Sequence, residues 1–230
     1  MNVSIMKYYL EKLYPFQDKI VKVIQTCETQ FYLTGGTVLS RKYLKHRYSD
    51  DLDFFVNDDQ KFKNYVTTIE KKLFSENLNF HVLTRADDFV RIVATTDYEV
   101  QLTIDFVNDV TYHYNGFQQD EKLGTIDNIQ NILSNKISAL SRLEVKDFID
   151  VVFIARFFTF SWKKVIDQAI MKDAWVNPID VSKLFNTIDT HLIKLIKWIH
   201  PVDENKIERD FHIIARDVLI GTENSLAQKA

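Results

Sequence analysis

Apolar residues follow two different periods in the first half of the chain. Spacing typical of a helix is found over residues 5–13, 15–29, 38–45 and 60–77. In the last of these segments Phe62, Tyr65, Val66, Ile69 and Leu73 share one face. Short apolar or alternating runs predict strands over residues 31–33, 51–56, 80–83, 89–93 and 100–107. Turn-prone residues separate the last three runs, so we expect a β-meander that completes a mixed sheet.

The strand pattern stops after about Gly124. From there the periodicity predicts helices over residues 127–142, 146–160, 162–172, 178–200 and 203–220. The predicted fold class is α+β, with a mixed sheet and helices over residues 1–125 and an all-α helical bundle over residues 126–230. The boundary is expected somewhere within residues 110–126.

Composition excludes several classes of protein. The chain has 230 residues, of which 46% are hydrophobic, which is enough to form the core of one large or two small domains. Five glycines and three prolines exclude a collagen-like or disordered chain, and one cysteine excludes a disulfide framework or a multi-cysteine zinc site. The N-terminal stretch lacks the apolar segment of a signal peptide, and no apolar run reaches the roughly 20 residues of a membrane helix. We therefore expect a cytoplasmic protein with no membrane partner, and the net charge of -3 gives no general attraction for polyanions.

Two of the five glycines, Gly35 and Gly36, are adjacent and lie between a predicted strand and a predicted helix. Glycine lets the backbone bend sharply and lets a bulky anion come close. A helix N-terminus offers unpaired N–H groups and a positive dipole end, and Thr37 is placed to cap it. A glycine pair alone is more often an ordinary turn, but this position predicts a phosphate-binding turn.

Carboxylates at a spacing of two residues follow this turn. Asp51 and Asp53 are expected on one face of a strand, with Leu52 and Phe54 facing the core. Two carboxylates on one face repel each other unless a cation lies between them, and oxygen ligands suit Mg²⁺ or Mn²⁺. Asp105 lies on the polar face of the strand over 100–107 and adds a third carboxylate. Three acids beside a phosphate-binding turn form the layout needed for two-metal phosphoryl or nucleotidyl transfer.

These residues resemble a known pattern. Gly35-Gly36-Thr37, Asp51-x-Asp53 and the later Asp105 are similar to the motif of the DNA polymerase β-like nucleotidyltransferases. The fuller string, Gly-Gly-Thr-x-Leu followed by His46-Arg47-x-Ser49-x-Asp51-Leu52-Asp53-Phe54-Phe55, resembles more narrowly the AbiEii/AbiGii-type toxin nucleotidyltransferases. In the second half, Lys136-Ile137-x-Ala139-Leu140, Arg142 and Lys146-Asp147-x-x-Asp150 resemble the later motifs of that family. The resemblance covers about residues 30–155.

The resemblance implies a role for each matching residue. Asp51 and Asp53 would hold the metals, Mg²⁺ or Mn²⁺, and Asp105 would be the third acid of the metal site, which orients or deprotonates the attacking hydroxyl. The β- and γ-phosphates of an NTP would be held by Gly35, Gly36 and Thr37. Lys136 would contact the triphosphate, and Asp147 would complete the site from the helical domain. The active site is then expected in the cleft between the two domains.

The resemblance also implies a biological role. Members of the family transfer nucleotides from NTPs to an acceptor, which is tRNA in some of them, and act as the toxin of toxin–antitoxin pairs, some in phage defence. We therefore expect an NTP-dependent toxin with an RNA or protein acceptor and a cognate antitoxin.

Several of the candidate residues have plainer structural explanations. The basic stretch over residues 41–47 is either a solvated helix face or a site that attracts the triphosphate or an RNA acceptor. Arg47, which is closest to the acids, is the preferred nucleotide-binding member, and Ser49 either joins it or shapes the turn. Asp50 is expected on the opposite side of the strand, where it is solvated or pairs locally.

The motif residues of the second half are open to similar alternatives. A lysine such as Lys136 on an amphipathic helix is usually exposed, and Asp147 could simply interact with the dipole of a helix N-terminus. Lys146 and Asp150 are four residues apart and could form a helix ion pair, and Arg142 is equally consistent with either role.

Three other functions compete with the toxin. One is an antibiotic-modifying nucleotidyltransferase with a small-molecule acceptor. A second is a protein that binds nucleotide or an antitoxin without turnover, against which the three retained acids argue. The third is a helical bundle with an incidental α/β cap. The acceptor, the preferred base and the oligomeric state do not follow from the residues.

Overall fold

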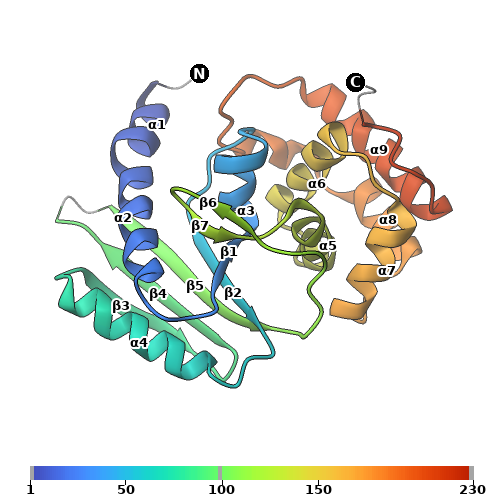
Figure 1. Ribbon diagram of the computed structural model, residues 1–230. Helices are drawn as coiled ribbons and strands as arrows, with labels where there is room; N and C mark the ends of the chain where they lie inside the picture. Colours follow the sequence, from blue (N-terminus) through green and yellow to red (C-terminus); the bar gives the residue numbers. More distant parts are fainter. Residues whose placement is uncertain (1–2, 98–99, 228–230) are drawn as a thin grey trace. The chain divides into compact units, whose positions relative to one another are not determined.

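The computed structural model describes residues 3–97 and 100–227. Contacts divide the chain into two compact units, Met1–Asn128 and Ile129–Ala230. The sequence pattern had placed this division after residue 125. The two units, which we call unit 1 and unit 2, are described separately (Figure 1).

Unit 1 contains a mixed seven-stranded sheet with the strand order β3-β4-β5-β2-β1-β7-β6. Strands β3, β4 and β5 form an antiparallel meander, as predicted, and β5 then pairs in parallel with β2. The strands are β1 (Tyr32–Thr34), β2 (Leu52–Asn57), β3 (Asn79–Arg85), β4 (Phe89–Thr95), β5 (Gln101–Asp109), β6 (Gln118–Asp120) and β7 (Gly124–Ile126).

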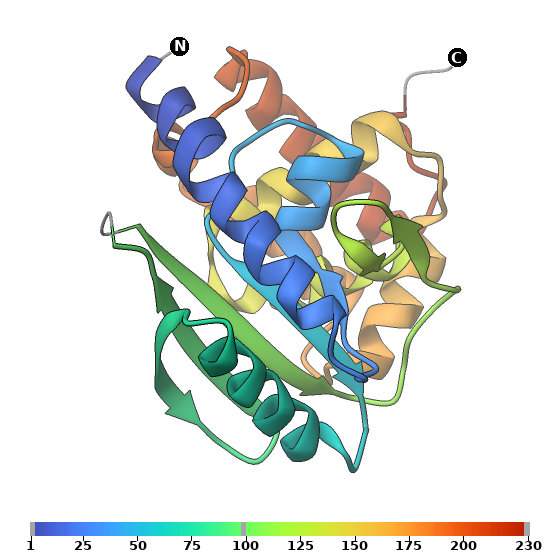
Figure 2. The same cartoon turned by 60° about the vertical axis from the view of Figure 1, so that its left-hand side comes forward.

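Two long helical segments cover one face of this sheet (Figure 2). The first consists of α1 (Val3–Tyr8), a π-helical segment (Tyr9–Leu13) and α2 (Tyr14–Gln25), and the second is α4 (Phe62–Ser75). The apolar side of β2, β4 and β5 is buried beneath them, and the ring of Phe31 contacts both Phe62 of α4 and Phe106 of β5. The opposite face of β2, β4 and β5 carries the polar residues of these alternating strands.

The N-terminal helices differ from the prediction, which had separate helices over residues 5–13 and 15–29. The backbone stays helical from α1 to α2, because the N–H of Tyr14 donates to the carbonyl of Tyr9 and closes a wider π turn. Pro15 then lies in the first turn of α2, where its missing N–H is tolerated.

The sequence pattern predicted neither β6 nor β7, although the last strand does end close to Gly124 as expected. Strand β7 pairs in parallel with β1, with Leu33 opposite Ile126, and β6 pairs with β7. These three-residue strands are too short to show an alternating pattern, so pairing with β1 rather than local periodicity makes them strands. The predicted helix over 38–45 also begins earlier, because α3 (Gly35–Val38) starts directly after β1 and continues into a π-helical segment (Leu39–Tyr43).

Unit 2 is built from helices. They are α5 (Ile129–Ala139), α6 (Val145–Phe157), α7 (Trp162–Lys172), α8 (Pro178–Thr187) and α9 (Glu204–Ile220), with 3₁₀ segments at Leu140–Arg142 and Thr190–Leu195. The rings of Phe148, Phe185 and Phe211 join α6, α8 and α9. An isolated antiparallel bridge pairs Ser161 with Glu223.

The helix predicted over residues 178–200 is wrong beyond Thr187. Ile188 adopts an extended conformation at the end of α8, and the side chain of Asp189 accepts the N–H of His191, which starts a new 3₁₀ turn. By contrast, α7 has the predicted bounds. Among the described residues, no helix combines the length and apolar character needed to cross a membrane.

Candidate active site

The Gly35-Gly36 turn packs directly against predicted site residues. Gly35 has a φ of +70°, and a Cβ atom there would overlap the carboxylate of Asp53. A Cβ atom on Gly36 would lie 2.8 Å from Nη2 of Arg47 and 3.0 Å from Oγ of Ser49. Both glycines are therefore required, because side chains of the acidic strand and the preceding loop occupy the space beside the turn. Five predicted residues come together here.

Thr37 does not cap a helix, contrary to the prediction. Helix α3 begins at Gly35, so Thr37 lies inside it, and its hydroxyl donates to the backbone carbonyl of Asp51. This bond ties the turn to the residue that precedes β2. Thr37 therefore positions the backbone of the acidic segment, which is a different structural role from the one that the sequence suggested.

The acids of β2 and β5 lie opposite each other. Leu52 and Phe54 are buried on the core side, whereas Asp51 and Asp53 are half-buried. Strands β2 and β5 are parallel neighbours, and their register places Asp53 beside Asp105. Residues in register on adjacent strands point to the same face, so Asp53 and Asp105 share one face of the sheet.

Arg91 is a residue of this face that the sequence reasoning missed. It lies opposite Asp105 on the neighbouring β4, and its Nε and Nη2 donate to the two carboxylate oxygens of Asp105 at 2.7 and 2.6 Å. The pKa of Arg91 is raised, chiefly by these hydrogen bonds, and the charges of Asp51 and Asp53 act in the same direction. Alternation along 89–93 places Arg91 on the polar face, but only the strand register could have revealed its partner.

The donor chemistry of Asp51 and Asp53 fits a hard divalent cation, since Asp53 on β2 and Asp51 directly before it both offer carboxylate oxygens. Arg91, however, holds both oxygens of Asp105. Over the described residues there is no group of three or more Asp, Glu, His or Cys side chains that could hold a metal ion. Asp51 and Asp53 therefore fit the metal, while the third acid, Asp105, is engaged by an arginine.

A buried network supports the start of the turn. Asp127 has no exposed surface, and it accepts hydrogen bonds from the hydroxyl of Thr34 at 2.7 Å and from the N–H of Asn128 at 2.8 Å. The Oδ1 atom of Asp127 that accepts the N–H of Asn128 also lies 3.0 Å from Nε2 of His113. Thr34 is the last residue of β1, so this network fixes the strand end from which the glycine turn departs. No local pattern in the sequence indicated it, because its members are far apart in the chain.

Most of the basic stretch over residues 41–47 is engaged locally. Arg41 forms an ion pair with Asp18 and lies 4.8 Å from the ring centroid of Tyr14. Lys42 pairs with Asp120 at 2.9 Å. Arg47 differs from both, because it is buried and its Nη1 donates to the carbonyl of Tyr48 at 3.0 Å. Arg47 is therefore the member that lies against the glycine turn.

Asp50 is exposed, in line with one of the two alternatives that the sequence left open, and its partner is far away in the chain. Its carboxylate accepts the phenolic hydroxyl of Tyr9, whose ring stacks on Tyr48 with 4.2 Å between the centroids. The pKa of the Tyr9 hydroxyl is raised, first by burial and then by the bond to Asp50.

The motif residues of unit 2 form a buried charge cluster. Nζ of Lys136 lies 2.7 Å from Oδ1 of Asp147 and 2.7 Å from Oδ2 of Asp150. Lys136 is 8% exposed, and the two carboxylates are almost completely buried. Arg142, on the surface, reaches the other oxygen of Asp147 at 3.2 Å. The lysine is therefore buried rather than exposed, and Asp150 pairs with Lys136 on the neighbouring helix.

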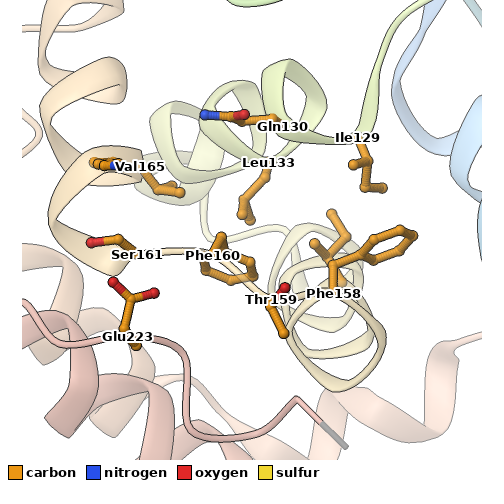
Figure 3. Close-up of a pocket in the computed structure, with 11 residues that line it drawn as sticks. Ile129, Gln130, Leu133, Phe158, Thr159, Phe160, Ser161, Val165 and Glu223 are labelled. Atoms are coloured by element: carbon orange, nitrogen blue, oxygen red, sulfur yellow. The ribbon is translucent and has the colours of Figure 1, made fainter. Parts of the chain in front are cut away.

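The predicted residues thus form two groups, one in each unit. Two hollows contain none of them. In unit 1 a hollow of about 600 Å³ lies beside Lys12 and Phe16 of the N-terminal helices. In unit 2 a hollow of about 340 Å³ has an apolar lining that includes Leu133, Phe158 and Val165, with polar groups such as Ser161 and Glu223 (Figure 3).

The chain that carries this glycine turn, these acids and the Lys–Asp cluster of unit 2 also matches a protein family. The family described as "Nucleotidyl transferase AbiEii toxin, Type IV TA system" matches residues 22–217. The chain belongs to the AbiEii nucleotidyltransferase toxin family. It is accordingly a nucleotidyltransferase. No curated protein gives a match.

Solved structures show the same fold as this AbiEii-family chain. MenT4, a nucleotidyltransferase toxin from Mycobacterium tuberculosis, has a TM-score of 0.66 at 17% identity, covering 90% of this chain and 82% of MenT4. The JHP933 protein of Helicobacter pylori has a TM-score of 0.62 at 18% identity, covering 91% of this chain and 93% of JHP933. At these identities the likeness concerns the fold alone.

Proposed function

We propose that this chain transfers a nucleotide from an NTP to an acceptor hydroxyl in a reaction that depends on Mg²⁺ or Mn²⁺. The observation that carries the proposal is the packing of the Gly35-Gly36 turn against Asp53 and Arg47. This packing places the backbone amides of the turn next to the guanidinium of Arg47 and the carboxylate of Asp53. An anion and a hard cation both find suitable groups there.

In this proposal each site residue of unit 1 has a separate role. The amides of the turn and the guanidinium of Arg47 bind the β- and γ-phosphates, with the hydroxyl of Ser49 beside them. Thr37 holds the backbone of Asp51 in place. Asp51 and Asp53 would hold the divalent cation, which would supply positive charge to stabilise the attacking and leaving oxygens. Asp105 orients the acceptor hydroxyl or takes its proton.

The cluster of unit 2 contributes the remaining groups. Lys136 would contact the triphosphate, and Asp147 would complete the site from unit 2. In the structure these two side chains hold each other through the ion pair at 2.7 Å. The ion pair restricts both side chains to one arrangement, which favours a positioned rather than a mobile cation.

The acceptor that we favour is RNA, such as tRNA, with a protein as the second choice. The AbiEii family is described as a type IV toxin–antitoxin system, which supports the role of toxin and the existence of a cognate antitoxin. An antibiotic-modifying enzyme with a small-molecule acceptor, and a protein that binds nucleotide without turnover, are the competing functions. Action inside the cytoplasm is part of the proposal, because NTPs and tRNA are found there.

Incubation of the purified protein with each α-labelled NTP, Mg²⁺ and either total RNA or cell lysate tests this function. We expect a labelled band that ribonuclease removes and protease does not. A labelled band that only protease removes would favour the protein acceptor. Label on an added antibiotic, or no label together with no release of pyrophosphate, would contradict the proposed toxin.

A further inference from the structure

The face of the unit 1 sheet that carries Asp53 and Asp105 also carries a positively charged side chain, that of Arg91. Arg91 makes a two-point hydrogen bond with Asp105, through Nε at 2.7 Å and Nη2 at 2.6 Å. Two parallel N–H···O bonds between a guanidinium and a carboxylate are among the strongest side-chain contacts in proteins. They use the oxygens that Asp105 would offer to a metal or to a hydroxyl.

The strand register explains why this pair lies in the site. Arg91, Asp105 and Asp53 are aligned across three neighbouring strands, β4, β5 and β2. The charges of Asp51 and Asp53 also act on the Arg91 guanidinium. Three carboxylates on one face repel each other, and Arg91 reduces this repulsion when no divalent cation is bound.

Arg91 is more exposed to water than the carboxylate that it binds. Its side chain is 41% exposed, whereas Asp105 is 13% exposed, so the guanidinium has access to water. Its guanidinium carbon lies 5.5 Å from the ring centroid of Phe89 on the same strand. The guanidinium therefore contacts the ring of Phe89 while it is bonded to Asp105.

We propose that Arg91 is an internal counter-cation that a divalent metal must displace from Asp105, so that it weakens metal binding and controls when the third acid is released for the reaction. This inference rests on the proposed function. It makes Arg91 a positioning residue that acts through Asp105, and it predicts competition between an arginine and a metal for one carboxylate.

Binding of Mn²⁺ alone, followed by electron paramagnetic resonance or calorimetry without nucleotide, tests the proposal. An opposite charge at hydrogen-bonding distance changes the proton affinity of a carboxylate by about one to three orders of magnitude, and we expect a comparable effect on the metal. Arg91→Gln should therefore bind Mn²⁺ about tenfold more tightly than the unaltered protein. Adding Asp105→Asn to Arg91→Gln should abolish this gain.

Arg85→Gln is the matched control. Arg85 lies on β3 and pairs with Glu70 of α4, so it carries the same charge in an ion pair on the helix-covered side of the sheet. The Arg85→Gln variant should bind Mn²⁺ with the same affinity as the unaltered protein. If Arg91→Gln is too unstable to purify, Arg91→Lys, which keeps the charge but cannot make the two-point bond, should bind Mn²⁺ more tightly by a smaller factor.

The outcomes separate this inference from the proposed function. If the unaltered protein binds Mn²⁺, Asp53→Asn abolishes binding, and Arg91→Gln binds no more tightly, the counter-cation proposal is wrong and the metal-dependent function stands. If neither the unaltered protein nor Arg91→Gln binds Mn²⁺, both are wrong.

Discussion

At the scale of the residue, the site is defined by what touches the two glycines. Gly35 faces the carboxylate of Asp53, and Gly36 faces the guanidinium of Arg47. The sequence suggested glycines that leave room for a triphosphate. The structure shows that they also leave room for the protein's own charged side chains, so the same two positions set both the turn and the placement of the acid.

Replacement of either glycine by alanine should be harmful. At Gly35 an alanine would adopt a φ of +70°, which costs an L-residue about 1–2 kcal/mol, and its Cβ would also displace Asp53. At Gly36 the Cβ would push Arg47 away from 2.8 Å. We expect both variants to lose stability and transfer. Gly116→Ala is the control, since a Cβ there has no neighbour within 4 Å, and urea unfolding with a transfer assay makes the comparison.

Asp53 should be essential for chemistry and not for folding. Asp53→Asn keeps the shape of the side chain but removes a charge that the cation needs, so transfer should fall by at least about a hundredfold. The exposed Asp87, which pairs with Lys63, supplies the control Asp87→Asn. Retention of near-normal transfer by Asp53→Asn, with an unchanged circular dichroism spectrum, would remove this residue from the site.

At the scale of the element, the strands of unit 1 show what periodicity can and cannot specify. The polar and apolar positions of β2 and β5 were predicted correctly, because alternation is a local property of a strand. The partner of Arg91 was not, because register is set between strands. For the same reason β7 was missed, since only its pairing with β1 makes it a strand.

In unit 2, a buried ion pair joins helices α5 and α6, and its loss should destabilise the protein. Lys136→Met would remove the buried cation from Asp147 and Asp150 and leave Asp147 only the exposed Arg142, which costs about 3–5 kcal/mol. Lys163→Met is the matched control, because Lys163 forms an exposed pair within one helix, and its loss should cost about 0–1 kcal/mol. Chemical denaturation measures both.

A third variant checks the cause of this loss. If unpaired buried charge destabilises Lys136→Met, then adding Asp147→Asn and Asp150→Asn should restore part of the stability, because the neutral amides need no cation. An equal or greater loss in the triple variant would instead attribute the effect to packing around the lysine side chain.

At the scale of the whole molecule, the candidate residues are divided between two compact units. If both groups serve one reaction, a change in unit 2 should stop transfer without affecting the metal held in unit 1. We expect Asp147→Asn to lower transfer by at least about tenfold while the Mn²⁺ affinity stays as in the unaltered protein. The exposed Asp167 gives the control Asp167→Asn, and thermal unfolding confirms that each variant is folded.

An unchanged rate of transfer in Asp147→Asn would assign the Lys136 cluster to stability alone. A parallel loss of transfer and Mn²⁺ binding would show that Asp147 acts on the metal, which differs from the role proposed here. Both measurements are therefore needed on the same preparation.

The sequence by itself determined the elements whose patterns are local. It showed the amphipathic helix that contains Phe62 and Leu73, the strand–glycine–helix junction at Gly35 and the paired acids Asp51 and Asp53. Each depends on residues that are close in the chain, where helix or strand periodicity and glycine's conformational freedom act directly.

Only the tertiary structure decided which distant residues meet. It paired Arg91 with Asp105, placed Asp127 beneath Thr34 and buried Lys136 between two acids. These contacts depend on strand register and helix packing, which result from burial of apolar surface over the whole unit. An ion pair contributes little free energy to the choice of strand register. The residue that pairs with Arg91 therefore cannot be identified from the charges along the chain.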